Sequence, residues 1–325
     1  LPIWWLGASV RYAQSIDENK PVFALIESSY IPWTLMTLPE TGLRISIAQI
    51  VASGGQPWLA MYGPGISNLA SWNAVGKSFN KLREIEKYLG ERETIKFAAL
   101  HFSERSIRLY GRNQVDSRYL DHFYGFYKAL LRSHIPFNIV QDETLANPDQ
   151  LKDYGVIVLP NSACLSKTET TAVSSFVRNG GGLVATFRAS LLNEEGHQLG
   201  NFGLSDALSV DYAGSITSSL FGYARIRGNH EITQPLGTNT IFPYTDESLS
   251  VRTKGTAKAL CTLISPSTSS FTTLGSDTEL PVLTVAEGRP GRAVYFPGKP
   301  DSIYLLYHLD VYRQLLERAV KWSAS

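Results

Sequence analysis

The sequence predicts two α/β units: a doubly wound domain over residues 96–325, preceded by a shorter α-β-α-β-α segment over residues 1–95. Three observations predict the larger domain. After Lys96, short apolar segments alternate with amphipathic helical patterns, the apolar segments are almost free of polar residues, and the connections are long enough for helical crossovers. Strands that are buried on both faces have this uninterrupted apolar character. At 325 residues the chain also exceeds the usual size of a single hydrophobic core.

The larger domain is expected to begin with four strands joined by helices. The first helix is predicted to start at Asp116 as its N-cap and to end at Ile135, because Pro136 cannot continue it. The helix before the fourth strand is predicted to begin at Ser166, where Glu169 completes a capping-box pattern. The four expected strands are residues 96–102, 137–140, 155–159 and 183–187.

The pattern changes after about residue 206. Residues 206–280 contain short β-like segments separated by Ser, Thr and Gly, which predicts a β-rich insertion or extension. Residues 281–285 and 292–296 flank a turn that contains Gly and Pro, and are expected to form a β-hairpin. The terminal helix has an apolar face able to pack on the sheet, formed by Tyr312, Leu315, Leu316, Ala319, Val320 and Trp322.

Residues 1–95 are organised differently. The expected elements are helices at residues 5–15, 39–53 and 71–89, and strands at 20–26 and 56–62. A complete (β/α)8 barrel needs roughly 200 residues, so this segment is too short to be one, although it has the order of a barrel's final portion. The sequence also starts without methionine and within an element, so we expect a fragment, a processed product or a trimmed chain.

Composition excludes several classes of protein. With 43% hydrophobic and 18% charged residues the sequence is that of a globular protein. Thirty basic and 29 acidic residues leave a net charge of +1, without a dense basic cluster, so nucleic acid is not an expected partner. No apolar run reaches the roughly 18 residues that a membrane-spanning helix needs. We expect a cytoplasmic protein whose two cysteines, Cys164 and Cys261, are reduced.

Four stretches of the larger domain follow one another along the chain: residues 127–137, 151–161, 176–186 and 291–296. The order and the spacing of these stretches resemble those of the trimerisation domain of bacterial beta-galactosidases and related glycosyl hydrolases. The resemblance implies a class I glutamine amidotransferase-like, flavodoxin-like fold that follows a (β/α)8 barrel and helps subunits to associate as a homo-oligomer. Residues 20–27 and 52–62 resemble the seventh and eighth strands of that barrel.

The family resemblance implies a retaining glycosidase that uses two carboxylates about 5 Å apart. Glu27 matches the nucleophile by position, and it also follows a predicted strand, where barrel enzymes place catalytic groups. The acid/base partner is expected from an earlier strand, so this chain alone is expected to be inactive. The alternative is that Glu27 is a solvated or helix-capping residue. Four aromatic residues are candidates for a sugar-binding platform or, alternatively, for plain core positions: Tyr30, Trp33, Trp58 and Tyr62.

An active amidotransferase carries a nucleophilic cysteine on a strained turn after a central strand. Here the turn after residues 183–186 carries Phe187, Arg188 and Ala189, which offer neither a thiol nor a hydroxyl. Cys164 follows the preceding strand between apolar neighbours, which favours a packed thiol over a reactive one. The chain is therefore not expected to be an active amidotransferase.

Cofactors and metals are not predicted. The six histidines are scattered, and His122 and His134 are too far apart on one helix to share a metal ion. Residues 103–105 lie after the first strand of the larger domain, at an edge where doubly wound sheets often bind ligands. The leading hypothesis is that the chain is part of a glycoside hydrolase of carbohydrate metabolism, which acts on a carbohydrate substrate. The alternative hypothesis is that the chain is a non-catalytic assembly or carbohydrate-binding module with the same fold.

Overall fold

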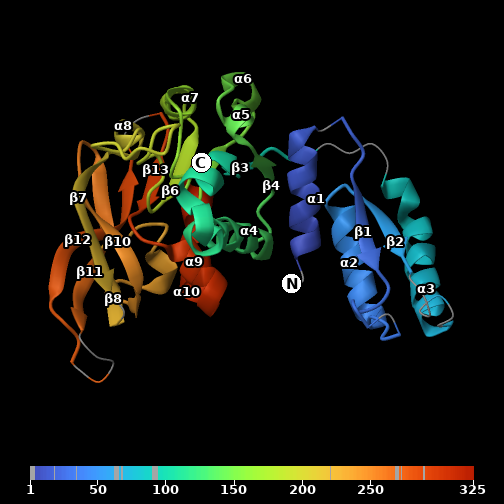
Figure 1. The fold of residues 1–325 in the computed structure, drawn as a ribbon. Coiled ribbons are helices and arrows are strands. Elements are labelled where there is room, and N and C mark those ends of the chain that lie inside the picture. The colour runs from blue at the N-terminus through green and yellow to red at the C-terminus, as the bar shows by residue number, and fades with distance from the viewer. Residues whose placement is uncertain are drawn as a thin grey trace. The chain divides into compact units, whose positions relative to one another are not determined.

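The computed structural model describes residues 4–17, 19–33, 35–61, 66, 69–89, 94–219, 221–267, 271, 273–287 and 290–325. The chain forms two compact units, Leu1–Thr94 (unit 1) and Ile95–Ser325 (unit 2). Figure 1 shows the helices and strands of both units.

Unit 1 has the predicted α-β-α-β-α order. Its elements are α1 (Trp5–Ile16), β1 (Phe23–Glu27), α2 (Glu40–Ala52), β2 (Gln56–Ala60) and α3 (Leu69–Ile85), followed by a 3-10 turn (Glu86–Tyr88). The two strands are parallel neighbours, with Phe23 opposite Gln56 and Glu27 opposite Ala60. Both strands therefore end at the same edge of the small sheet.

The helices of unit 1 bury one face of its sheet. Ile26 of β1 packs in one apolar cluster with residues of all three helices, and Ala24 and Leu59 lie against it. The buried residues of α2 recur at the spacing of one helix face: Leu43, Ile47, Ile50 and Val51. Because side chains alternate along a strand, Phe23, Leu25 and Trp58 point to the opposite face, and they are exposed.

Unit 2 is built on a nine-stranded mixed sheet in the order β4-β3-β5-β6-β13-β12-β11-β8-β9. Its first part is parallel and consists of β4 (Phe137–Val140), β3 (Ala98–His101), β5 (Val156–Leu159), β6 (Gly182–Thr186) and β13 (Ala293–Phe296). Taken along the chain, these five strands have the spatial order 2-1-3-4-5, which is that of flavodoxin-like sheets. All four predicted strands are present.

Helices cover both faces of the parallel part. Ile157 and Leu159 of β5 pack with α5 (Asp142–Leu145), α6 (Pro148–Leu151) and α7 (Lys167–Arg178) in one core cluster. The remaining long helices of unit 2, α4 (Asp121–Arg132), α9 (Pro300–Tyr307) and α10 (Asp310–Ser323), pack on one another, and α10 also contacts β5, β6 and β13. All six residues predicted to form the apolar face of α10 are buried. None of the six belongs to the core cluster that contains α5, α6 and α7, so α4, α9 and α10 cover the opposite face of the sheet.

The predicted start of the first helix is wrong, whereas that of α7 is confirmed. Asp116 is not an N-cap, because the chain before it is already helical, in a π-helical segment (Ser106–Gly111) and a 3-10 turn (Arg112–Gln114). Asp116 itself begins a second π-helical segment (Asp116–Leu120), which leads into α4. At α7, the Ser166 side chain accepts a hydrogen bond from the Glu169 amide, and the Glu169 carboxylate accepts one from the Ser166 amide.

Most strands of the β-rich segment extend the same sheet. After α8 (Ser205–Leu208), the strands are β7 (Val210–Ser219), β8 (Phe221–Ile226), β9 (Ile241–Pro243), β10 (Asp246–Thr253), β11 (Ala257–Ser267) and β12 (Asp277–Ala286), with a 3-10 turn (Gln234–Leu236). The antiparallel pair of β12 and β13 is the predicted hairpin, and it joins the extension to the parallel part. Strands β7 and β10 form a separate antiparallel pair.

Candidate functional site

Glu27 is the last residue of β1, at the edge where both strands of unit 1 end. Its register partner is Ala60, and the next amide, that of Ser28, donates a hydrogen bond of 3.1 Å to the Ala60 carbonyl. Alternation along β1 places Glu27 on the same face as Leu25, opposite the helices. Its carboxylate is therefore half-buried at the carboxyl edge of a parallel sheet, directed away from the helix layer.

A short loop after Glu27 carries two of the predicted aromatic residues. The loop folds back on itself, because the Tyr30 amide donates to the Met36 carbonyl and the Leu38 amide donates to the Ser28 carbonyl, both at 2.9 Å. The side chains of Tyr30 and Trp33 are 43% and 65% exposed. They are not core residues of unit 1.

The other two predicted aromatic residues belong to β2 and the segment after it. Trp58 lies opposite Leu25 in the strand register, on the same face as Glu27, and is also exposed. Tyr62 lies outside the described residues. The structure thus brings Glu27 and Trp58 to one face of the sheet, and places Tyr30 and Trp33 on the loop that begins directly after Glu27.

In unit 2, the turn after β6 has the backbone strain of a nucleophile-bearing turn but carries Phe187. Its φ of 49° lies in the left-handed region, which non-glycine residues seldom adopt. The Tyr295 hydroxyl donates to the Phe187 carbonyl at 2.5 Å, and the Phe187 amide donates to the Phe296 carbonyl at 2.8 Å. The buried ring stacks on His122, with ring centres 6.0 Å apart. Neither Phe187 nor the next two residues of the turn, Arg188 and Ala189, carries a nucleophilic side chain.

Cys164 is packed rather than activated. Burial raises the pKa of its thiol to about 11, although Arg105 and Ser106 act in the opposite direction. The Cys164 amide donates to the Ser106 hydroxyl at 3.0 Å, which fixes the backbone in the loop after β5. A thiol with such a pKa is almost entirely protonated at neutral pH and is a poor nucleophile.

Residues 98–209 match the beta-galactosidase trimerisation domain. The match covers β3 to α8, that is, most of the parallel sheet and its helices. The comparison with curated proteins found no match.

Similar solved structures include three glycosidases. An alpha-L-fucosidase isoenzyme 2 from Paenibacillus thiaminolyticus has a TM-score of 0.76 at 18% identity, covering 97% of this chain and 46% of that one. A cold-adapted beta-galactosidase from Rahnella sp. R3 has a TM-score of 0.74 at 17% identity, and the match covers 98% of this chain and 48% of that one. The beta-galactosidase from Bacillus circulans sp. alkalophilus has a TM-score of 0.72 at 15% identity, and the match covers 96% of this chain and 47% of that one. At these identities the likeness shows the fold alone, and the chain spans about half the length of each of these structures.

Within the matched residues 98–209, three titratable side chains from separate segments meet. Ligand atoms of His101, Asp142 and Glu169 all lie within 4.8 Å of one another, and the three residues are buried. His101 ends β3, Asp142 begins α5, and Glu169 lies in the first turn of α7. The sequence analysis did not predict this group, because it looked for metal ligands close together in the sequence, whereas these three residues are far apart in it. Residues 103–105, which were singled out as lying at a possible ligand-binding edge of the sheet, directly follow β3 and thus His101.

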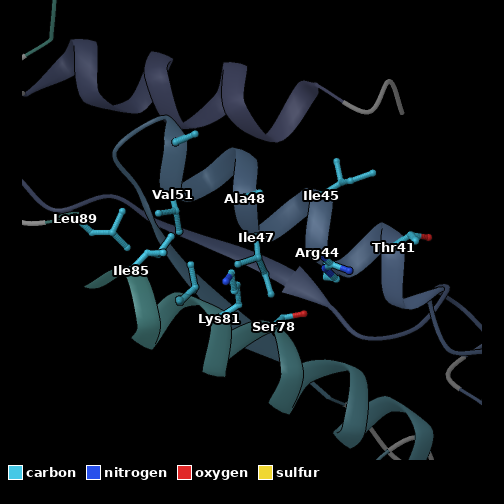
Figure 2. A pocket seen from close by; sticks show the side chains of 12 residues that line it. Thr41, Arg44, Ile45, Ile47, Ala48, Val51, Ser78, Lys81, Ile85 and Leu89 are labelled. Carbon is cyan, nitrogen blue, oxygen red and sulfur yellow. The ribbon is translucent and has the colours of Figure 1, made fainter. Parts of the chain in front are cut away.

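A groove of about 570 Å³ lies between α2 and α3 of unit 1. Figure 2 shows side chains of the two helices facing each other across it, with Ile47, Val51 and Ile85 among them. None of the predicted site residues that the structure describes lines this groove. Its lining is mainly aliphatic, so the groove lacks the converging polar groups of an active site.

None of the helices in the part of the chain that the structure describes is long and apolar enough to cross a bilayer.

Proposed function

We propose that the chain is part of a retaining glycoside hydrolase in which Glu27 is the catalytic nucleophile. The observation that supports this most is the position of Glu27: a half-buried carboxylate at the carboxyl end of a parallel strand, on the face opposite the helices. In (β/α)8 enzymes the catalytic groups occupy this position at the ends of barrel strands.

Unit 1 has the arrangement expected of two adjacent βα units from such a barrel. Its two strands are parallel, its helices cover one face, and the other face exposes the apolar side chains of Phe23, Leu25 and Trp58. Inward-pointing side chains of barrel strands are normally packed in layers in the interior. The exposed face is therefore assigned to the barrel interior, with Glu27 at its rim.

Glu27 would attack the anomeric carbon and form a covalent glycosyl-enzyme intermediate, which water then hydrolyses. A second carboxylate about 5 Å away acts first as acid and then as base, and the proposal assigns it to a barrel strand other than β1 and β2. Tyr30, Trp33, Trp58 and Tyr62 are proposed to form an apolar platform for a sugar ring. Because the similar structures are named as beta-galactosidases and as an alpha-L-fucosidase, a β-galactoside is the first substrate to test.

Unit 2 is proposed to be an amidotransferase-like association domain of a homo-oligomer. Two observations support this role: the match to the trimerisation domain, and a strained turn that carries the buried Phe187 instead of a nucleophile. The same observations favour a second candidate, a non-catalytic assembly or carbohydrate-binding module.

The test is performed on the gene product that contains these residues, with nitrophenyl β-galactoside as substrate. Glu27→Gln should lower kcat by about 10³-fold or more, since it removes the nucleophile. Glu40→Gln is the matched control, because Glu40 begins α2 and forms an exposed ion pair with Lys77. A 2-fluoro-galactoside that traps the covalent intermediate should add its mass to the peptide containing Glu27.

Two results would decide against the proposal. Trapping on another carboxylate would remove Glu27 from its role. A wild-type protein that hydrolyses no aryl β-galactoside, yet forms an intact oligomer in light scattering, would favour the assembly module.

A further inference from the structure

The polar group at the carboxyl edge of β3 and β5 has the organisation of a metal centre. We propose that His101, Asp142 and Glu169 bind one divalent transition-metal ion, with Zn²⁺ as the ion to test. The site lies in unit 2 and is independent of the proposed glycosidase site. It would connect the end of β3 with the starts of α5 and α7.

Each proposed ligand is held through one atom and presents another to the group. The Nδ1 atom of His101 is 2.9 Å from the Ser162 hydroxyl, and its Nε2 is 3.0 Å from Oδ1 of Asp142. The other carboxylate oxygen of Asp142, Oδ2, accepts a hydrogen bond of 3.1 Å from the Arg105 amide. Metal-bound histidines are commonly oriented in this way, through a hydrogen bond at the ring nitrogen that does not bind the metal.

Glu169 supplies an independent observation. Its Oε2 accepts hydrogen bonds of 2.5 Å from the Ser166 amide and the Arg105 guanidinium. Its Oε1 is buried without a hydrogen-bond partner, in a side chain that is only 1% exposed. Buried carboxylate oxygens are normally satisfied, so an unpartnered one on a residue whose carboxylate group lies close to an imidazole and a second carboxylate points to a cation site.

The distances fit a site that adjusts on binding. The 3.0 Å between Nε2 of His101 and Oδ1 of Asp142 is somewhat shorter than the roughly 3.4 Å between two ligands that each lie about 2.1 Å from one tetrahedral ion, so this pair has to open slightly. The group as a whole extends over 4.8 Å, so the Glu169 carboxylate has to move inward. One imidazole with two carboxylates suits zinc better than magnesium or calcium, which favour sites built of oxygen alone.

Arg105 is the group that a metal ion would displace. Its guanidinium is the cation that now neutralises Glu169, and its side chain is 27% exposed, whereas those of His101 and Glu169 are fully or almost fully buried. Zn²⁺ and this guanidinium repel each other in a poorly solvated site. Binding should therefore turn Arg105 towards solvent, and Arg105 should compete with the metal.

Because Arg105 competes with the metal, the proposal predicts variants that bind zinc more weakly and variants that bind it more tightly. The full chain is dialysed against Zn²⁺ at pH 7.5 and bound metal is counted per chain, with Co²⁺ absorbance as a second readout of the ligand set. The wild type should bind one ion. Glu169→Gln should bind it at least about 100-fold more weakly, since a charged ligand is lost, while glutamine keeps the capping box and thus the start of α7.

Arg105→Gln should bind Zn²⁺ about tenfold more tightly than the wild type, or more, because the competing charge is gone. His197→Gln is the matched control for surface binding, since exposed His197 lies 3.2 Å from exposed Glu195, and it should leave the affinity unchanged. The proposal is overturned if neither the wild type nor Arg105→Gln retains zinc, if Arg105→Gln binds no more tightly, or if His197→Gln abolishes binding while Glu169→Gln does not.

Discussion

Leu25 of β1 and Trp58 of β2 are register partners on the face of the small sheet opposite the helices, and they are 45% and 63% exposed. The next residue along β1, Ile26, points to the helices and is 5% exposed. Two adjacent residues of one strand therefore have opposite environments, as the two-residue period of a strand requires.

We expect Ile26→Ala to destabilise unit 1 by about 2–4 kcal/mol, because it leaves a cavity between β1 and α2. Leu25→Ala should cost less than about 1 kcal/mol, because little buried surface is lost. Urea unfolding of the chain, with hydrogen exchange followed in peptides from residues 23–60, separates the two effects. Equal losses for the two variants would mean that the face containing Leu25 is covered in solution.

Two glycines in helices should respond oppositely to alanine. A Cβ atom on Gly125 of α4 would lie 2.1 Å from the Asp301 carbonyl oxygen of α9, so Gly125→Ala should force the helices apart and cost about 1–3 kcal/mol or more. A Cβ on Gly76 of α3 meets nothing within 4 Å, and Gly76→Ala should stabilise its unit by about 0.5–1 kcal/mol through helix propensity. Denaturant midpoints measure both. A tolerated Gly125→Ala would contradict the close approach of α4 and α9.

Cys164 should react slowly with iodoacetamide in the folded protein. A pKa raised from 9.0 to about 11 lowers the thiolate fraction at neutral pH about 100-fold, and burial slows access further. The measurement uses Cys261→Ser, so that only Cys164 is labelled, and compares rates in buffer and in urea. Labelling in buffer at the rate of a free thiol would show an activated Cys164.

His230 should make stability depend on pH. Burial is the main cause that lowers the pKa of His230 from the ordinary 6.5, and the positive charges of Lys258 and Arg292 lower it further. The negative charges of Glu287 and Glu231 raise this pKa, but by less. The unfolded state then binds the proton first as the pH falls. The contribution of the neutral imidazole is therefore complete above about pH 6.5 and declines as the pH falls from there to the lower folded-state pKa.

The structure also supplies a reason for this preference. Nδ1 of neutral His230 accepts a hydrogen bond of 3.2 Å from the Ile232 amide, which a protonated ring cannot accept. Urea midpoints at pH 7.5 and 5.5 should differ more in the wild type than in His230→Gln. The exposed His197→Gln variant should keep the wild-type difference, and a pH effect lost in that variant instead would assign it to His197.

The helices and strands of both units were largely predictable because their signals are local. The capping box of Ser166 and Glu169, the apolar face of α10 and the inward residues of α2 depend only on residues within about two helical turns. Asp116 shows the limit of such signals. A residue suited to cap a helix does not cap one when the preceding chain is already helical.

The candidate sites depended on tertiary structure to different degrees. The position of Glu27 at a strand end was predictable, since β1 follows a clear apolar pattern. The exposure of Trp58 was not, because its hydrophobicity fits a core position as well as an open face. The strained Phe187 was likewise not predictable, since its backbone forms hydrogen bonds with the Tyr295 hydroxyl and the Phe296 carbonyl, which belong to a strand distant in sequence.

By itself, the sequence determined the order and type of the elements, the absence of a nucleophile after β6, and the carboxylate that ends β1. Only the tertiary structure brought His101, Asp142 and Glu169 together, directed Leu25 and Trp58 away from the helices, and joined the β-rich segment to the parallel sheet. The physical reason is the distance along the sequence over which each kind of interaction acts. Periodicity and capping act between near neighbours in the chain, whereas sheet order and burial arise from packing between segments that are distant in sequence.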